Sequence, residues 1–248
     1  MDKYSGKSVF GGIAIGKIQM FKKGRQEIKS IKSDNPVFEI VRFNNARNKA
    51  VEELQNLYKK ALKEVGEGNA AIFKIHQMML NDKNYTKCVE DFITKQGVSA
   101  EFAVAATRDN FHYMFSEMDN EYIKARSVDV RDVSERVIRI LCNAESNVLN
   151  AKVPSIIVAD DLAPSETVQL DKDLVLGFVT AHGSPDSHTA ILARTMSIPA
   201  VIAEDIPLDG SINGKIAVVD GYSGVVYIDP DNGLVKQMQA IQKKEHHK

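Results

Sequence analysis

One histidine stands where a chain can hold an anion. In HGSPDSHTAILAR (residues 182–194), His188 follows a loop of small residues and precedes an apolar run at 189–193 that predicts a helix. The first turn of a helix has unpaired backbone N–H groups, and its dipole favours a negative group beside them. A phosphoryl group on an imidazole nitrogen would be stabilised at this position. The stretch therefore predicts a phosphohistidine, although a lone histidine can also be a surface residue without a role.

Hydroxyl groups lie on both sides of the histidine. Ser187 and Thr189 could donate hydrogen bonds to phosphoryl oxygens, and Arg194 lies six residues further on. Arg194 could reach back to the phosphoryl group or could be only an ion-pair partner. We predict Ser187, Thr189 and Arg194 as phosphate-binding residues.

A nucleophilic histidine needs one ring nitrogen free and the other held protonated. LAPSETVQL (residues 162–170) offers the hydroxyls of Ser165 and Thr167 at a second junction between a strand and a helix. Either hydroxyl could orient the ring. Either could instead cap a short helix whose first turn contains Glu166.

Strand patterns surround these two junctions. Runs rich in Val and Ile, bounded by turn residues, predict strands, and GYSG (221–224) predicts a hairpin. The short helices of the junctions interleave with the strands, which favours an α/β domain. The strand runs lie at 7–21, 155–160, 174–180, 199–203 and 215–220, and the helical stretches at 165–170, 189–196 and 233–244.

Residues 35–142 show only helical periodicity. Asn35 and Pro36 are typical of the N-cap and first position of a helix, and short connections predict a bundle. The predicted helices span about 35–65, 69–80, 82–95, 99–118 and 121–141. The simplest architecture is an α/β domain into which this helical bundle is inserted after the first strands. Linkers between these parts are expected near residues 21–34, 142–154 and 229–235, where a domain that must face two partners in turn could swivel.

Bulk composition excludes several classes. The 248 residues carry a net charge of −1, and no apolar run approaches the roughly 20 residues of a membrane span. Cys88 and Cys142 lack the spacing of a metal site. We expect no nucleic acid partner, no membrane insertion and a cytoplasmic setting.

Several stretches resemble one protein family, in order along the chain. The segment from Gly183 to Val201 resembles the phosphohistidine loop of Enzyme I of the bacterial phosphoenolpyruvate:sugar phosphotransferase system. GIAIGK (12–17) looks like the first strand of that family, and DLAPSETVQL (161–170) is similar to its DLTPSETAQL. AAIFKIHQMMLND (70–82) and EYIKARSVDVRDVSERVIRIL (121–141) look like two of its helices.

The resemblance implies a fold and a reaction. It implies an α/β phosphohistidine domain (1–21 and 143–232), an inserted helical domain (35–142) that binds the carrier protein HPr, and a linker helix (233–248). It implies phosphorylation of His188 on Nε2, with Thr167 orienting the ring. The phosphoenolpyruvate site and its Mg²⁺ would lie in a C-terminal barrel, which would also make the full enzyme a homodimer. This chain would then hold no cofactor or metal, be monomeric, and exchange phosphate with HPr without using phosphoenolpyruvate alone.

The resemblance also implies a binding face for HPr on the helical domain. The face would combine the 70–82 helix with the segment that follows it, 82–89. The opposite wall of the groove could be lined by Met114, Met118, Tyr122 and Arg126. An apolar stripe at helical spacing can equally be core. The residues predicted to bind the partner are Phe73, His76, Met78, Met79, Leu80, Asp82, Tyr122 and Arg126.

The chain departs from the family pattern in the loop before the histidine. The family usually has GGxTSH, whereas Ser184 and Asp186 replace its second glycine and its threonine, and Gly11 replaces a proline in SPGIA. Two alternatives stay open. One is the swivelling domain of a pyruvate phosphate dikinase or phosphoenolpyruvate synthase, and the other is an HPr-docking module that has lost phosphoryl transfer.

Overall fold

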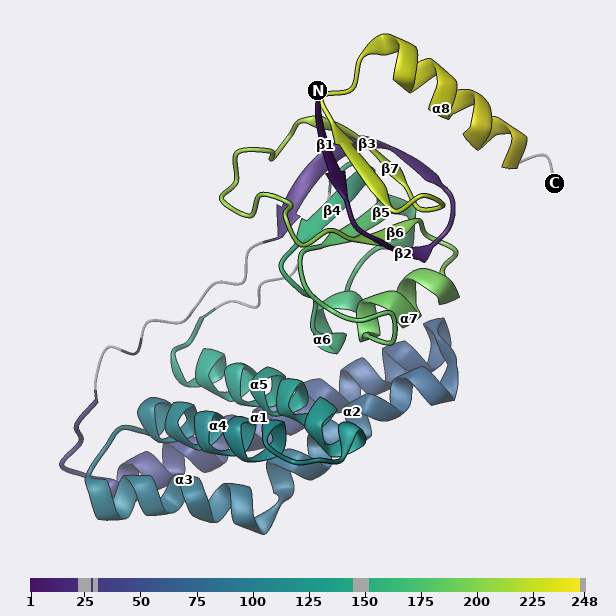
Figure 1. Cartoon of the computed structure of the whole chain (residues 1–248). Helices are drawn as coiled ribbons and strands as arrows, with labels where there is room; N and C mark the ends of the chain where they lie inside the picture. The colour runs from purple at the N-terminus through teal and green to yellow at the C-terminus, as the bar shows by residue number, and fades with distance from the viewer. Residues whose placement is uncertain (22–27, 29–30, 145–151, 246–248) are drawn as a thin grey trace. The chain divides into compact units, whose positions relative to one another are not determined.

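The computed structural model of the chain divides into two compact units (Figure 1). It describes residues 1–21, 28, 31–144 and 152–245. One unit comprises Met1–Lys23 with Asn147–Lys248, and the other comprises Gly24–Ser146. The helical unit is thus one continuous segment, and the α/β unit is built from both ends of the chain. The predicted swivel ranges 21–34 and 142–154 lie partly outside the described residues.

The described part of the first unit contains one eight-stranded sheet in the order β1-β8-β7-β3-β4-β5-β6-β2. Strands β3, β4, β5 and β6 are parallel neighbours, and the other pairs are antiparallel. The strands are β1 (Asp2–Ser5), β2 (Lys7–Phe10), β3 (Ile13–Phe21), β4 (Ser155–Ala159), β5 (Val175–Thr180), β6 (Ala200–Ile202), β7 (Ile216–Asp220) and β8 (Val225–Ile228). Strands β4, β5 and β6 are almost wholly buried, as expected for parallel strands with both faces covered, and they are correspondingly apolar.

Two features of this sheet differ from the sequence prediction. β1 was not predicted, because DKYS has no run of apolar residues, yet it pairs with β8 at one edge of the sheet. The predicted run at 7–21 is two strands, because the chain turns at Gly11 and Gly12 and Gly12 has φ +122°. β2 consequently pairs with β6 at the opposite edge of the sheet.

The C-terminal helix packs on the sheet of its own unit. The helices of this unit are α6 (Pro164–Thr167), the 3₁₀ turn η1 (Lys172–Leu174), α7 (His188–Thr195) and α8 (Asn232–Glu245). In α8, Met238 is buried against Ile13 and Val218, and Gln242 Nε2 donates to the carbonyl of Ile13 at 2.9 Å. A swivel at residues 229–235, as predicted from the sequence, would break these contacts.

The described helical unit contains α1 (Pro36–Glu64), α2 (Gly66–Asn81), α3 (Lys83–Gln96), α4 (Ala100–Ser116) and α5 (Glu121–Leu141). Side chains cap four of these five helices, and the cap at Asn35 is the one that the sequence predicted. Asn35 accepts from the N–H of Phe38, Ser99 accepts from Phe102, and Gly97 ends α3 with φ +59°. Helix α2 begins three residues before its predicted start, because Gly66 adopts φ +82° and lets the chain turn directly from α1 into α2.

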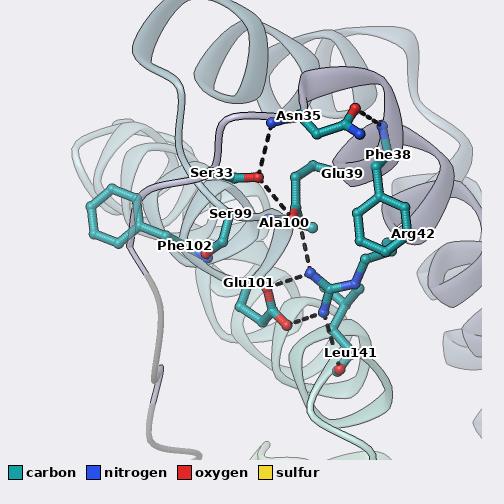
Figure 2. Close-up of polar contacts among 10 residues, drawn as sticks. All are labelled: Ser33, Asn35, Phe38, Glu39, Arg42, Ser99, Ala100, Glu101, Phe102 and Leu141. Atoms are coloured by element: carbon teal, nitrogen blue, oxygen red, sulfur yellow. Dashed lines mark hydrogen bonds and ion pairs between the residues drawn. The ribbon is translucent and has the colours of Figure 1, made fainter.

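A buried polar network joins three helix ends in this unit (Figure 2). Glu39 is 5% exposed, and its Oε2 accepts from the N–H of Ala100 at 2.8 Å and from Arg42 Nη1 at 2.7 Å. Glu39 Oε1 accepts from the hydroxyl of Ser33 at 3.1 Å. Arg42 also binds Glu101, and it donates to the carbonyl of Leu141 at 3.4 Å. The hydrogen bond to Glu101 is the main cause that raises the pKa of Arg42.

Glu39 should therefore contribute strongly to the stability of the helical unit. We expect Glu39→Ala to lower its free energy of unfolding by about 3 kcal/mol, because the buried N–H of Ala100 loses its acceptor and Arg42 loses one of its two carboxylate partners. Glu52→Ala on the exposed face of α1 is the matched control and should change stability by less than about 0.5 kcal/mol. Urea unfolding followed by circular dichroism measures both variants. Equal stabilities would contradict this assignment.

Candidate functional site

The two junctions predicted to carry chemistry both follow the carboxyl ends of neighbouring parallel strands, β4 and β5. β4 and β5 are parallel, with Ala159 opposite Thr180, and the chain continues from these residues toward α6 and α7. The pairing extends past the strand ends, since the N–H of His182 donates to the carbonyl of Asp160 at 2.8 Å. Ligand sites in α/β sheets typically form at the carboxyl ends of such strands.

His188 is the first residue of α7 and is half-buried. The sequence predicted that the helix begins at Thr189, so it begins one residue earlier. Ser187 is its N-cap, and the Ser187 Oγ accepts from the N–H of Ala190 at 3.3 Å. The imidazole is therefore carried by the first turn itself, where N–H groups and the helix dipole favour an anion.

Thr189 faces the protein interior. It is 4% exposed, and its hydroxyl is directed at the carbonyl of Leu162, 3.4 Å away. This hydrogen bond links α7 to the chain before α6. The predicted contact of the Thr189 hydroxyl with a phosphoryl oxygen stays a prediction, and the backbone N–H of Thr189 also lies in the first turn of α7.

Thr167 and Ser165 are both buried on α6, which packs against α7. Neither residue caps α6, because Ala163 occupies the N-cap position and Glu166 reaches back to accept from its N–H at 2.6 Å. The Thr167 hydroxyl donates to the carbonyl of Pro164 at 2.8 Å. Because the one hydroxyl proton is donated to Pro164, Thr167 Oγ1 can act toward any further partner only as a hydrogen-bond acceptor.

The loop before His188 contains Gly183, Ser184 and Asp186, which differ in conformation and contacts. Gly183 has φ +126°, a conformation that favours glycine. Ser184 shapes a turn, since its carbonyl accepts from the N–H of Ser187 at 3.0 Å and its Oγ accepts from the N–H of Asp186 at 3.3 Å. Asp186 is exposed. The serine that replaces the family's second glycine thus stabilises the turn before the histidine.

Arg194 lies in the last turn of α7 and is exposed. A rise of 1.5 Å per residue places its Cα roughly 9 Å along the helix axis from that of His188. Its predicted role in phosphate binding stays a prediction.

An exposed histidine–aspartate pair at the carboxyl ends of β4 and β5 was not predicted from the sequence. His182 Nδ1 forms a short hydrogen bond with Asp160 Oδ1, and both side chains are exposed. This hydrogen bond is the main cause that raises the pKa of His182, and the charge of the same carboxylate adds to it. The signal was a histidine two residues after one strand and an aspartate directly after the neighbouring strand.

The predicted partner-binding residues divide into buried and accessible sets. Phe73, His76 and Leu80 are 0% exposed, so the prediction that they bind a partner is wrong, since their side chains belong to the helical core. Met78 and Tyr122 are 71% and 66% exposed. Met79 and Arg126 are half-buried, and Asp82 is exposed while its carboxylate caps α3.

The described residues provide neither a metal-binding cluster nor a membrane-spanning helix. Within the ranges that the structure describes, no three His, Cys, Asp or Glu side chains are grouped so that they could hold a metal ion. None of the described helices combines the length and the apolar character that crossing a membrane requires.

Known proteins match this chain over nearly its whole length. The family model "PEP-utilising enzyme, N-terminal" matches residues 5–126, and "PEP-utilising enzyme, mobile domain" matches residues 151–224. A solution structure of Enzyme I determined by NMR is 32% identical, with a TM-score of 0.79 over 98% of this chain and 99% of that one. The chain belongs to the Enzyme I family.

Two curated members of the Enzyme I family are longer than this chain. Phosphoenolpyruvate-protein phosphotransferase of Bacillus subtilis (strain 168) is 37% identical over 96% of this chain and 42% of its own length. The protein of the same name from Haemophilus influenzae is 35% identical over 94% of this chain and 41% of its own length. The chain therefore spans less than half the length of these relatives.

The His182–Asp160 pair can be tested by titration. We expect the pKa of His182 to lie above its ordinary value and to return toward that value in Asp160→Asn, because the carboxylate stabilises the imidazolium. A raised pKa means that the pair stabilises the folded chain at low pH and that this contribution is lost as pH rises through the pKa of His182. NMR of the His182 ring protons against pH measures it.

Glu204→Gln is the control for the titration of His182. Glu204 raises the pKa of His182 only through its charge and less than Asp160 does, so this variant should change it little. A pKa of His182 that is the same in the wild type and in Asp160→Asn would refute the pairing.

Proposed function

We propose that this chain carries the phosphohistidine of a phosphoenolpyruvate–protein phosphotransferase, with His188 as the nucleophile. The observation that supports this most directly is the position of His188 in the first turn of α7, which follows the carboxyl end of the parallel strand β5. The membership of the chain in the Enzyme I family supports it as well. The curated relatives bear the name of that activity.

The proposed reaction has two transfers. The Nε2–P bond forms at His188 while the P–O bond of phosphoenolpyruvate breaks and pyruvate leaves. The Nε2–P bond then breaks as a histidine of HPr attacks the phosphorus. The transition state of such a transfer is loose, so catalysis depends on in-line positioning and charge stabilisation. The first-turn N–H groups of α7 and the Ser187 hydroxyl would bind the phosphoryl oxygens.

Thr167 would set the tautomer of His188. Its hydroxyl proton is donated to Pro164, so toward an imidazole its oxygen can act only as an acceptor. An acceptor at Nδ1 keeps the proton on that nitrogen and leaves the lone pair of Nε2 free to attack.

The proposed partner is HPr, which would bind to the helical unit. Exposed side chains at the ends of α2, α4 and α5 support a docking face, because large apolar side chains that face solvent are typical of protein interfaces. The accessible residues are Met78, Met114, Met118, Tyr122 and, in part, Met79 and Arg126.

Phosphoenolpyruvate and its Mg²⁺ are proposed to bind in the part of the full-length relatives that this chain does not span. That part would also form the homodimer, so this chain would be a monomer. A cytoplasmic location is proposed as well, since sugar phosphorylation uses a cytoplasmic phosphate donor.

Transfer from phosphorylated HPr tests His188 directly. The 248-residue chain mixed with ³²P-phospho-HPr should acquire acid-labile label, and His188→Ala should acquire none, because the label would be a phosphoramidate on that ring. Phosphoenolpyruvate alone should leave the wild type unlabelled.

Each other outcome of this labelling experiment has a definite meaning. Label that survives His188→Ala would rule out this nucleophile. A wild type that binds HPr without acquiring label would be a docking module. A wild type that neither binds HPr nor acquires label would favour the swivelling domain of a pyruvate phosphate dikinase or phosphoenolpyruvate synthase.

The tautomer assignment makes a separate prediction. Thr167→Val should slow phosphoryl transfer from phospho-HPr about tenfold, the equivalent of one lost hydrogen bond, with the affinity for HPr unchanged. Thr167→Ser keeps the hydroxyl and should transfer at the wild-type rate. The ¹⁵N shifts of His188 should show the proton on Nδ1 in the wild type and a mixture of tautomers in Thr167→Val. Equal rates in both variants would contradict the role of Thr167.

A further inference from the structure

A chain of polar contacts leads from the core of the helical unit to its surface. His76 on α2 is fully buried, and its Nε2 lies 3.2 Å from Asp129 Oδ1 on α5. The other oxygen of that carboxylate, Asp129 Oδ2, accepts from Arg126 Nη1 at 2.7 Å. The two oxygens of one buried carboxylate are thus divided between a core histidine and an arginine near the surface.

Arg126 is held from a second direction as well. Its guanidinium carbon lies 4.5 Å from the centroid of the Tyr122 ring, and the Tyr122 side chain is exposed. A guanidinium has five N–H donors in a rigid plane. With Nη1 bound to Asp129 and the plane set by Tyr122, the direction of the other donors is fixed.

Packing alone does not account for a buried histidine and carboxylate. Asp129 has a side chain that is only 4% exposed, and burying a carboxylate costs free energy that apolar residues of similar size would not cost. The arrangement is accounted for if His76 fixes the rotation of the Asp129 carboxylate and Asp129 then fixes Arg126.

We propose that Asp129, oriented by His76, is a positioning residue that presents the Arg126 guanidinium to an anionic group on the docked carrier. The identity of the carrier rests on the proposed function, whereas the orientation of Arg126 does not. His76 then serves partner binding from the core, without touching the partner. The anion is either a carboxylate of HPr or the phosphoryl group that HPr carries.

The chain offers a matched control on the same helix. Asp132 also approaches His76, from the side of Nδ1, with 3.7 Å between Nδ1 and Asp132 Oδ2. Asp129→Asn and Asp132→Asn therefore remove the same charge next to the same ring, but only the first replaces the anionic acceptor of Arg126 by a neutral amide. His76→Gln keeps an N–H donor toward Asp129, and His76→Leu removes it.

The first measurement needs no partner. In ¹⁵N NMR, the Arg126 guanidinium should show restricted rotation in the wild type and in Asp132→Asn, and free rotation in Asp129→Asn. A freely rotating guanidinium in the wild type would overturn the proposal, whether or not the chain binds HPr. A wild type that binds no HPr would instead refute the proposed function.

The second measurement is the Kd for HPr and for phospho-HPr by calorimetry. Asp129→Asn and His76→Leu should each weaken binding about tenfold, the size of one charge-assisted hydrogen bond. Asp132→Asn and His76→Gln should bind like the wild type. Asp129→Asn should add no loss in an Arg126→Ala background, because it acts through Arg126. A larger loss for phospho-HPr than for HPr would identify the phosphoryl group as the anion, and equal losses would identify a carboxylate.

Three results of the binding measurements would also overturn the proposal. These are wild-type affinity in Asp129→Asn, an equal loss in Asp132→Asn, and a full additional loss in the Arg126→Ala background. Thermal unfolding of every variant separates a misfolded chain from a weakened contact. Should Asp129→Asn not fold, the comparison of His76→Gln with His76→Leu decides the question alone.

Discussion

The parallel pairing of β4 with β5 is the constraint on which the candidate site depends. It places Ala159 opposite Thr180, so the segments that follow these residues start side by side although they lie about twenty residues apart in the sequence. The contacts of His182 with Asp160 and of Thr189 with Leu162 both follow from this register. A shift of one residue would turn the buried side chains of one strand to the other face of the sheet and would move the segments after the two strands out of line with each other. The chemistry proposed for His188 is therefore specified by backbone hydrogen bonds between two strands that contain none of the reacting groups.

In the helical unit, buried polar groups perform the function that strand register performs in the sheet. Apolar side chains stabilise a bundle but tolerate small rotations of one helix against another. Glu39 and His76 each have hydrogen-bond partners on other helices or turns, and these partners must be met at fixed geometry. Burying these groups costs desolvation free energy, and their hydrogen bonds in return fix one arrangement of the helix ends and of the surface around Arg126.

Local features of both units could be predicted from the sequence, because their causes lie within a few residues. The caps at Asn35 and Ser99 and the stop at Gly97 depend on side chains next to the helix ends. The pairing of β3 with β4 and of β1 with β8 could not be predicted, nor could the contact of His76 with Asp129, since each joins residues more than fifty positions apart. Phe73 and Leu80 illustrate a further limit. Helical spacing shows that residues share a face, but it does not show whether that face is covered.

The helical unit is inserted between two strands that are direct neighbours in the sheet, and this arrangement has a consequence for folding. β3 and β4 pair with Phe21 opposite Ala159, so their pairing closes a loop that contains the whole inserted unit. Closing so long a flexible loop has a large entropic cost, and non-local parallel pairs form slowly. The Glu39 and Arg42 contacts hold Ser33 near Leu141, where the chain enters and leaves the unit. An insert that folds first therefore shortens the effective loop, so the rate at which the sheet closes should depend on ion pairs that lie outside it.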